Sequence, residues 1–170
     1  MVNNRYTAKK AAFLGLFAAA AVALSAAENM VPPLPFMPPG AKLGLSNVIT
    51  MLLSVNGMLP EAMLISLAKG GFSLLTRGVT SGIMSACGGL LSSLVVFLLA
   101  KCEKFGYAGL GIAGAVSHNM AQLAVSCIII GKAAVYYMPF LIIFAAVSGT
   151  LTALILKYIT PYAERFGILK

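Results

Sequence analysis

Six long apolar segments take up most of the 170 residues and leave only short stretches of proline, glycine and charge between them. The chain is 60% hydrophobic and 9% charged, whereas a soluble domain carries about 25% charged residues. A helix that crosses the hydrocarbon core of a bilayer needs ~20 apolar residues. We therefore predict an all-α integral membrane protein that forms one domain over residues 1–170.

The boundaries of the expected spans follow from prolines, glycines and charges. Prolines between residues 32 and 39 cannot continue the first helix, and they predict a stiff loop over about residues 29–41. Asn56-Gly57 is a turn signal, and Pro60-Glu61 is typical of a helix start. The second span is short for a full crossing. The expected spans are at about residues 8–27, 42–55, 61–76, 78–100, 108–130 and 135–158.

The formal net charge of +8 indicates membrane orientation rather than nucleic-acid binding. The basic residues cluster at segment ends and not along one amphipathic face. Cytoplasmic loops of membrane proteins collect Lys and Arg, so we expect a multi-pass protein of the cell membrane with both termini in the cytoplasm. With six spans, the inner segments then hold Arg5, Lys9, Lys10, Lys101, Lys104, Lys157, Arg165 and Lys170.

Several classes of enzyme are excluded by what the sequence lacks. It has no Asp and only four Glu, so it cannot supply paired aspartates for magnesium. Its cysteines lack metal-ligand spacing. The glycines of Gly109–Gly114 match a dinucleotide pattern, but no strand precedes them and no acid lies about 20 residues on. We expect no catalysis, no metal, no cofactor and no ATP hydrolysis by this chain, which also has no phosphate-binding loop.

Polar residues form lines along three of the expected helices. Lys42, Ser46, Thr50 and Ser54 lie four apart, Ser66, Lys69 and Ser73 share a face, and so do His118, Gln122 and Ser126. Ionisable residues inside a membrane mark functional sites, and cations there favour an anionic ligand. Lys42 and Arg77 could instead extend to the headgroups, and His118 and Asn119 could bond helix to helix. The expected ligand-binding residues are Lys42, Asn47, Lys69, Ser73, His118, Asn119 and Gln122.

The first span carries a ridge of small residues at four-residue spacing, namely Ala11, Gly15, Ala19 and Ala23. Small residues let another helix approach closely in lipid. The ridge predicts a docking surface for a partner, although packing within the chain would use the same pattern.

The segment from Pro32 to Thr50, with its Lys-Leu-Gly-Leu-Ser-Asn sequence, and the later His118-Asn119-Met-Ala-Gln122 resemble a known family. This is the Gx transporter family, also labelled heptaprenyl diphosphate synthase component I, and the resemblance covers essentially the whole chain. The family is grouped with the substrate-binding S components of energy-coupling factor (ECF) transporters. The resemblance implies a six-transmembrane-helix bundle, a proline-rich lid over an outward-facing pocket, and a ridge that faces a coupling membrane subunit driven by two cytoplasmic ATPases.

Three functions are compatible with this reading. The first is a transport subunit that captures a small amphiphilic, anionic molecule, either isoprenoid-like or vitamin-like, from the outer side. The second is a noncatalytic membrane accessory of a heptaprenyl or other prenyl diphosphate synthase. The third is a structural subunit of a membrane redox or lipid-processing complex.

Overall fold

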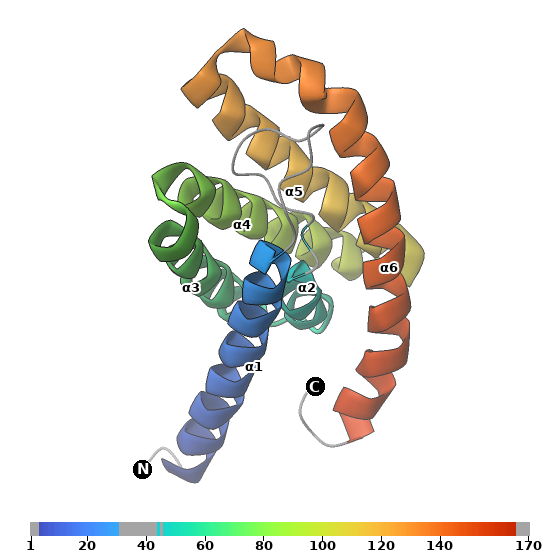
Figure 1. Ribbon diagram of the computed structural model, residues 1–170. Coiled ribbons are helices and arrows are strands. Elements are labelled where there is room, and N and C mark those ends of the chain that lie inside the picture. Colours follow the sequence, from blue (N-terminus) through green and yellow to red (C-terminus); the bar gives the residue numbers. More distant parts are fainter. Residues whose placement is uncertain (1–3, 31–43, 45, 166–170) are drawn as a thin grey trace.

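A computed structural model of the chain describes residues 4–30, 44 and 46–165. These residues form helices joined by short turns, and they contain no strand. The elements are α1 (Asn4–Met30), α2 (Asn47–Val55), α3 (Leu59–Arg77), α4 (Val79–Lys101), α5 (Tyr107–Ile130), a short 3₁₀ helix η1 (Lys132–Tyr137) and α6 (Met138–Arg165) (Figure 1).

Among the described residues, four helical segments are long and apolar enough to cross a membrane, namely those of α1, α4, α5 and α6 with η1. The described residues are thus all-helical, as expected, and four of the six predicted spans coincide with segments that are long and apolar enough to cross a membrane. α2 has nine residues and is about 13 Å long, which is less than half of the ~30 Å hydrocarbon core. The predicted shortness of the second span is therefore confirmed.

Two helix boundaries differ from the expectation for local reasons. α2 begins at Asn47 and not near residue 42, because Gly44 has a left-handed φ of +83° that a helix cannot contain. α6 begins at Met138 rather than residue 135, which puts Pro139 in the first turn, where its missing N–H is not needed. It then continues through Pro161 to Arg165, as membrane helices with proline can.

The short helix α2 lies at the centre of the bundle. α4 packs between α3 and α5, α6 packs along α5, and α1 crosses against α3, while α2 contacts α1, α3, α4 and α6 (Figure 1). Met51, Leu52 and Leu53 of α2 are almost completely buried in an apolar core that also contains Ile65 and Leu156. A helix too short to cross the membrane therefore joins the longer helices together.

Small residues bring neighbouring helices close. A Cβ added to Gly70 of α3 would lie 2.7 Å from the Cβ of Ala86 in α4, and one added to Gly111 of α5 would collide with the carbonyl of Gly149 in α6. Such contacts let backbones approach in an environment where lipid gives no hydrophobic drive to helix association.

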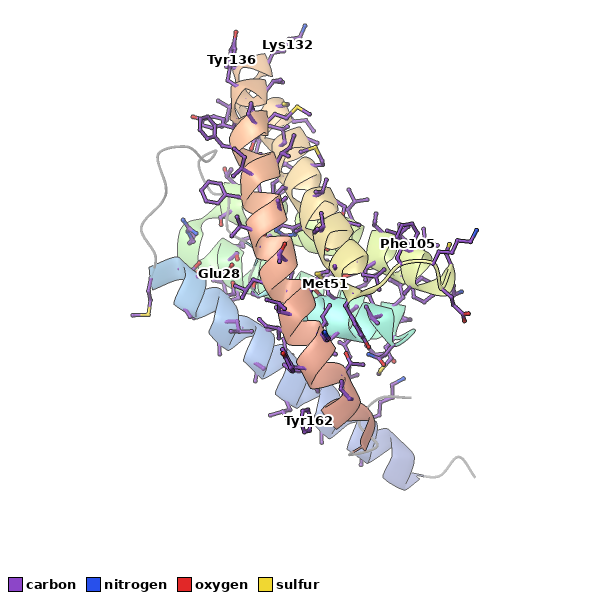
Figure 2. The ribbon with its side chains drawn as sticks, turned by 90° about the vertical axis from the view of Figure 1, so that its right-hand side faces the viewer. Glu28, Met51, Phe105, Lys132, Tyr136 and Tyr162 are labelled. Carbon is purple, nitrogen blue, oxygen red and sulfur yellow. The ribbon has the colours of Figure 1, made fainter. Side chains whose placement is uncertain are left out.

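The ends of α6 fit a membrane crossing. Tyr136 and Lys132 lie at one end and Tyr162 at the other (Figure 2), and the two tyrosines are 84% and 60% exposed. From Met138 to Tyr162 the helix rises about 36 Å. Tyrosines gather at both membrane interfaces, so this spacing fits the thickness of a bilayer.

Candidate functional site

Lys69 is the most deeply buried charged residue that the structure describes. It lies in α3, about 12 Å before the helix end at Arg77, and its side chain is 1% exposed. Its Nζ donates a hydrogen bond of 2.6 Å to Oδ1 of Asn47, the first residue of α2. Because an ammonium in such surroundings is expensive to desolvate, this position needs a functional or structural reason.

His118 and Gln122 form a second buried polar pair one turn apart on α5. Their Nε2 atoms are 3.0 Å apart, and the Gln122 amide donates this hydrogen bond when His118 carries its proton on Nδ1. Gln122 is 1% exposed, and its Oε1 is buried with no hydrogen-bond partner among the described residues. A buried group in that state is unfavourable by about 1–3 kcal/mol and is a position where a ligand or a water would be expected.

Gly44 joins the two pairs into one cluster. A Cβ added to this glycine would lie 3.0 Å from Nδ2 of Asn47 and 3.5 Å from Cδ2 of His118. Asn47 and His118 therefore border the same glycine, and the residues from α2, α3 and α5 meet around it.

Glu28 extends the cluster to the end of α1. Ser46 Oγ donates a hydrogen bond of 2.8 Å to Glu28 Oε2, and both side chains are buried. Because Ser46 directly precedes Asn47, this acid lies at the same end of α2 as Lys69. We call the set the interior polar cluster; it consists of Glu28, Ser46, Asn47, Lys69, His118 and Gln122.

The remaining predicted ligand residues have different positions. Ser73 is buried one turn beyond Lys69 on α3. The Nδ2 of Asn119 donates to the carbonyl of Leu141 in α6 at 2.8 Å, which is the helix-to-helix bond considered as an alternative above. Arg77 is partly exposed in the last turn of α3. Lys42 and the proline-rich loop lie outside the described residues.

Residues of α4, none of which was among the expected ligand-binding residues, also contribute to the interior. Ser81, Ser85, Gly88 and Ser92 are all buried, and their helical spacing was a signal in the sequence. A Cβ added to Gly88 would lie 2.6 Å from Cε1 and from Nδ1 of His118. The imidazole therefore lies directly against the backbone of α4, and Gly88 sets its position.

The small-residue ridge faces outward. Ala11, Gly15, Ala19 and Ala23 are all exposed on α1, and a Cβ added to Gly15 would have nothing within 4 Å in the part of the chain that the structure describes. Packing against the described helices therefore does not account for the ridge.

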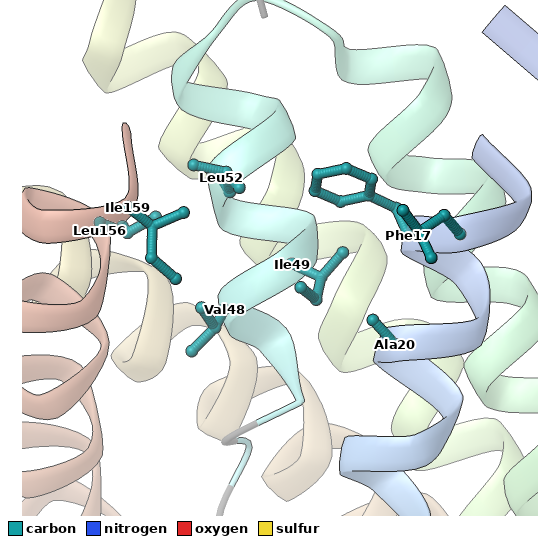
Figure 3. Close-up of a pocket in the computed structure, with 8 residues that line it drawn as sticks. Phe17, Ala20, Val48, Ile49, Leu52, Leu156 and Ile159 are labelled. Carbon is teal, nitrogen blue, oxygen red and sulfur yellow. The ribbon is translucent and has the colours of Figure 1, made fainter. Parts of the chain in front are cut away.

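A cavity of about 220 Å³ lies between α1, α2 and α6 (Figure 3). We call it the α1/α2/α6 groove, and every residue that lines it is apolar. These residues are Leu16, Phe17, Ala20, Val48, Ile49, Leu52, Leu156 and Ile159.

The described chain thus combines several apolar helices that are long enough to cross a membrane with a buried polar cluster, an architecture compatible with a multi-pass membrane protein. The chain belongs to the heptaprenyl diphosphate synthase component I family, whose model matches residues 17–159. That range contains the whole interior polar cluster. A search of curated proteins gave no match, and a search of solved structures gave none either.

Proposed function

We propose that this protein is the substrate-binding membrane subunit of an ECF-like transporter, and that it captures a small amphiphilic, anionic molecule from the outer side. One observation carries the proposal: a fully buried lysine lies in a cluster with a histidine and a glutamine whose amide oxygen has no partner among the described residues. Buried polar groups of this kind converge where ligands bind.

The chemistry of the cluster favours an anionic head and an apolar body. The Lys69 ammonium, together with the Asn47 amide, can form charge-assisted hydrogen bonds to phosphate or carboxylate oxygens. His118 and Gln122 add hydrogen-bonding groups, and Ser73 lies one turn further along α3. Apart from their buried serines and threonines, the described helices around the cluster are mostly apolar, which suits an isoprenoid-like or vitamin-like molecule.

The same proposal assigns the orientation and the partners. Because cytoplasmic segments of membrane proteins collect Lys and Arg, we assign both termini to the cytoplasmic side of the cell membrane, and α3 and α5 then run outward. The exposed ridge on α1 would dock a coupling transmembrane subunit, and cytoplasmic ATPases would supply the energy. The chain itself performs no catalysis in this scheme.

A second function is favoured by the description of the family. As a component I of heptaprenyl diphosphate synthase, the chain would be a noncatalytic membrane accessory of a separate enzyme. A soluble prenyl diphosphate synthase that copurifies with the chain would favour this function. Copurification with a coupling subunit and ATPases would favour transport.

The test is native mass spectrometry of the full chain, gently purified in mild detergent, with extraction of any bound small molecule. We expect an anionic amphiphile that is retained by the parent protein and by Lys157→Met, which removes an exposed lysine of α6. Lys69→Met should lose it by 100-fold or more while circular dichroism shows a folded protein. A ligand retained equally by Lys69→Met would overturn the assignment of the site.

A further inference from the structure

The α1/α2/α6 groove is large enough to hold part of a hydrocarbon chain. Its volume of about 220 Å³ exceeds the ~150 Å³ of an engineered apolar cavity that stays dry and binds benzene. All eight lining side chains are apolar, so polar groups have no partner there. The groove therefore fits at least one five-carbon isoprene unit.

The groove begins beside the interior polar cluster. Asn47, which accepts the Lys69 hydrogen bond, and Val48, which lines the groove, are consecutive residues in the first turn of α2. Figure 3 shows Val48, Ile49 and Leu52 on the faces of α2 directed toward α6 and α1. The interior polar cluster and the groove therefore meet at the first turn of α2.

The groove then extends along α1 and α2, away from the interior polar cluster. On α1 its lining residues Ala20 and Leu16 precede Glu28 of the cluster by about 12 Å and 18 Å of helix. On α2, Val48 and Leu52 are about 6 Å apart along the axis. A molecule with its head at the cluster would place its tail along α1 and α2, in the apolar groove.

We propose that the α1/α2/α6 groove is the subsite for the isoprenoid tail of the same ligand whose anionic head binds at Lys69 and Asn47. This rests on the proposed function and adds the tail to it. A helix of a partner protein does not fit, because a helix with side chains is about 10 Å across. A lipid acyl chain that enters from the bilayer is the alternative occupant, and the labelling experiment below distinguishes it from an isoprenoid tail.

The experiment measures the binding of inorganic diphosphate and of isopentenyl, geranyl and farnesyl diphosphate to the purified full chain in nanodiscs. Affinity should rise on the order of tenfold for each isoprene unit that enters the groove. Ala20→Phe should fill the groove, so that farnesyl diphosphate binds no better than inorganic diphosphate. Ala12→Phe makes the same change at an exposed position of α1. In this variant farnesyl diphosphate should still bind more tightly than inorganic diphosphate, by the same factor as in the parent protein.

Each outcome has a separate meaning. Equal affinities for farnesyl and inorganic diphosphate in the parent protein would overturn the tail subsite. An Ala20→Phe variant that still prefers farnesyl diphosphate as strongly as the parent protein does would also overturn it. If inorganic diphosphate still requires Lys69, the head site stands even when the tail subsite fails. If Lys69→Met leaves the binding of every probe unchanged, the proposed function fails.

A labelling experiment on the parent protein avoids any risk that Ala20→Phe does not fold. A farnesyl diphosphate analogue with a photoreactive terminal isoprene should label α6 around Leu156 and Ile159. Excess farnesyl diphosphate should suppress the labelling, whereas excess phosphatidylglycerol should not. Suppression by phosphatidylglycerol alone would identify the occupant as membrane lipid and would overturn the proposal.

Discussion

α1 and α5 are both apolar helices that can cross a membrane, but they are buried to different extents. The most apolar part of α1 has a mean hydropathy of 1.8 and is 17% buried, whereas that of α5 has a mean hydropathy of 1.4 and is 44% buried. The more apolar helix is thus the more exposed one. Hydropathy alone does not indicate which helix forms the interior, because the apolar segments of α4 and α6 have a higher mean hydropathy of 2.2 and are 39% buried.

The polar residues explain the difference. α5 buries His118, Asn119 and Gln122 among the other helices, and these residues lower its hydropathy. α1 buries its polar side chains Ser25 and Glu28 only near its end, while its small-residue ridge stays exposed. We infer that α5 belongs to the ligand-binding interior and that α1 links this interior to a partner.

The largest expected effect on stability comes from Asn47→Leu, which removes the acceptor of the Lys69 ammonium. A hydrogen bond to a charged group contributes about 1.5–3 kcal/mol, so the free energy of unfolding should fall by about that much. Circular dichroism melts in detergent would measure it. Native mass spectrometry should also show loss of bound farnesyl diphosphate.

The double variant Asn47→Leu/Lys69→Met is the control for this change. It removes the buried charge together with its acceptor and should recover part of the lost stability, because replacing both partners by apolar groups can be nearly neutral. A double variant no more stable than Asn47→Leu would show that the bond between Asn47 and Lys69 does not stabilise the interior.

The next largest effect is expected from Gly88→Ala, because the added Cβ would lie 2.6 Å from the His118 ring. Overpacking of this kind lowers stability by about 1–3 kcal/mol, and the displaced imidazole should weaken ligand binding. Gly71→Ala is the matched control, since nothing in the described chain lies within 4 Å of its Cβ position. It should be neutral or slightly stabilising. Equal melting temperatures for the two variants would contradict the close contact between α4 and α5.

A smaller effect is expected where α1 meets α3 through a salt bridge. Lys10 Nζ lies 2.5 Å from Glu61 Oε1, and the Lys10 side chain is 59% exposed. Exposed ion pairs contribute about 0.2–1 kcal/mol and are screened by salt. Lys10→Ala should therefore lower the melting temperature only slightly at low salt and not measurably at 1 M salt. A loss above about 2 kcal/mol would show that α1 is held to the bundle more tightly than its burial indicates.

The smallest effect on stability is expected from Gly15→Leu, which places a large side chain on the exposed ridge. No described residue lies within 4 Å of its Cβ position, so the melting temperature should stay the same or rise slightly. Copurification of a coupling membrane subunit should fall by tenfold or more. Ala146→Leu alters an exposed position of α6 and should keep the partner. A ridge variant that keeps its partner would remove α1 as the docking surface.

Much of the interior could be predicted from the sequence. The prediction that Lys69, His118 and Gln122 lie inside a helical bundle followed from their position within apolar segments, since such polarity is costly in a membrane. The contribution of Gly88 could not be predicted in this way. A glycine in a membrane helix fits against any close neighbour, and only the packing of α4 on α5 shows that this neighbour is His118.

The hydrogen-bond partner of each polar side chain could not be predicted from the sequence either. Asn47 and Asn119 were predicted for the same ligand site, but Asn47 accepts from Lys69 of α3 whereas Asn119 donates to Leu141 of α6. No pattern in the sequence predicted the α1/α2/α6 groove, because the residues that line it come from three helices that are far apart in the chain.

By itself, the sequence determined that the chain is a helical membrane protein of this family with charged and polar residues inside its apolar segments. Apolar length and the energetic penalty for exposing a polar backbone to lipid leave few alternatives. Only the tertiary structure decided that a nine-residue helix would occupy the centre, with the polar cluster and the apolar groove meeting at its first turn. The physical reason is that lipid and protein interior are equally apolar, so helices associate through shape and hydrogen bonds, which the sequence pattern does not specify.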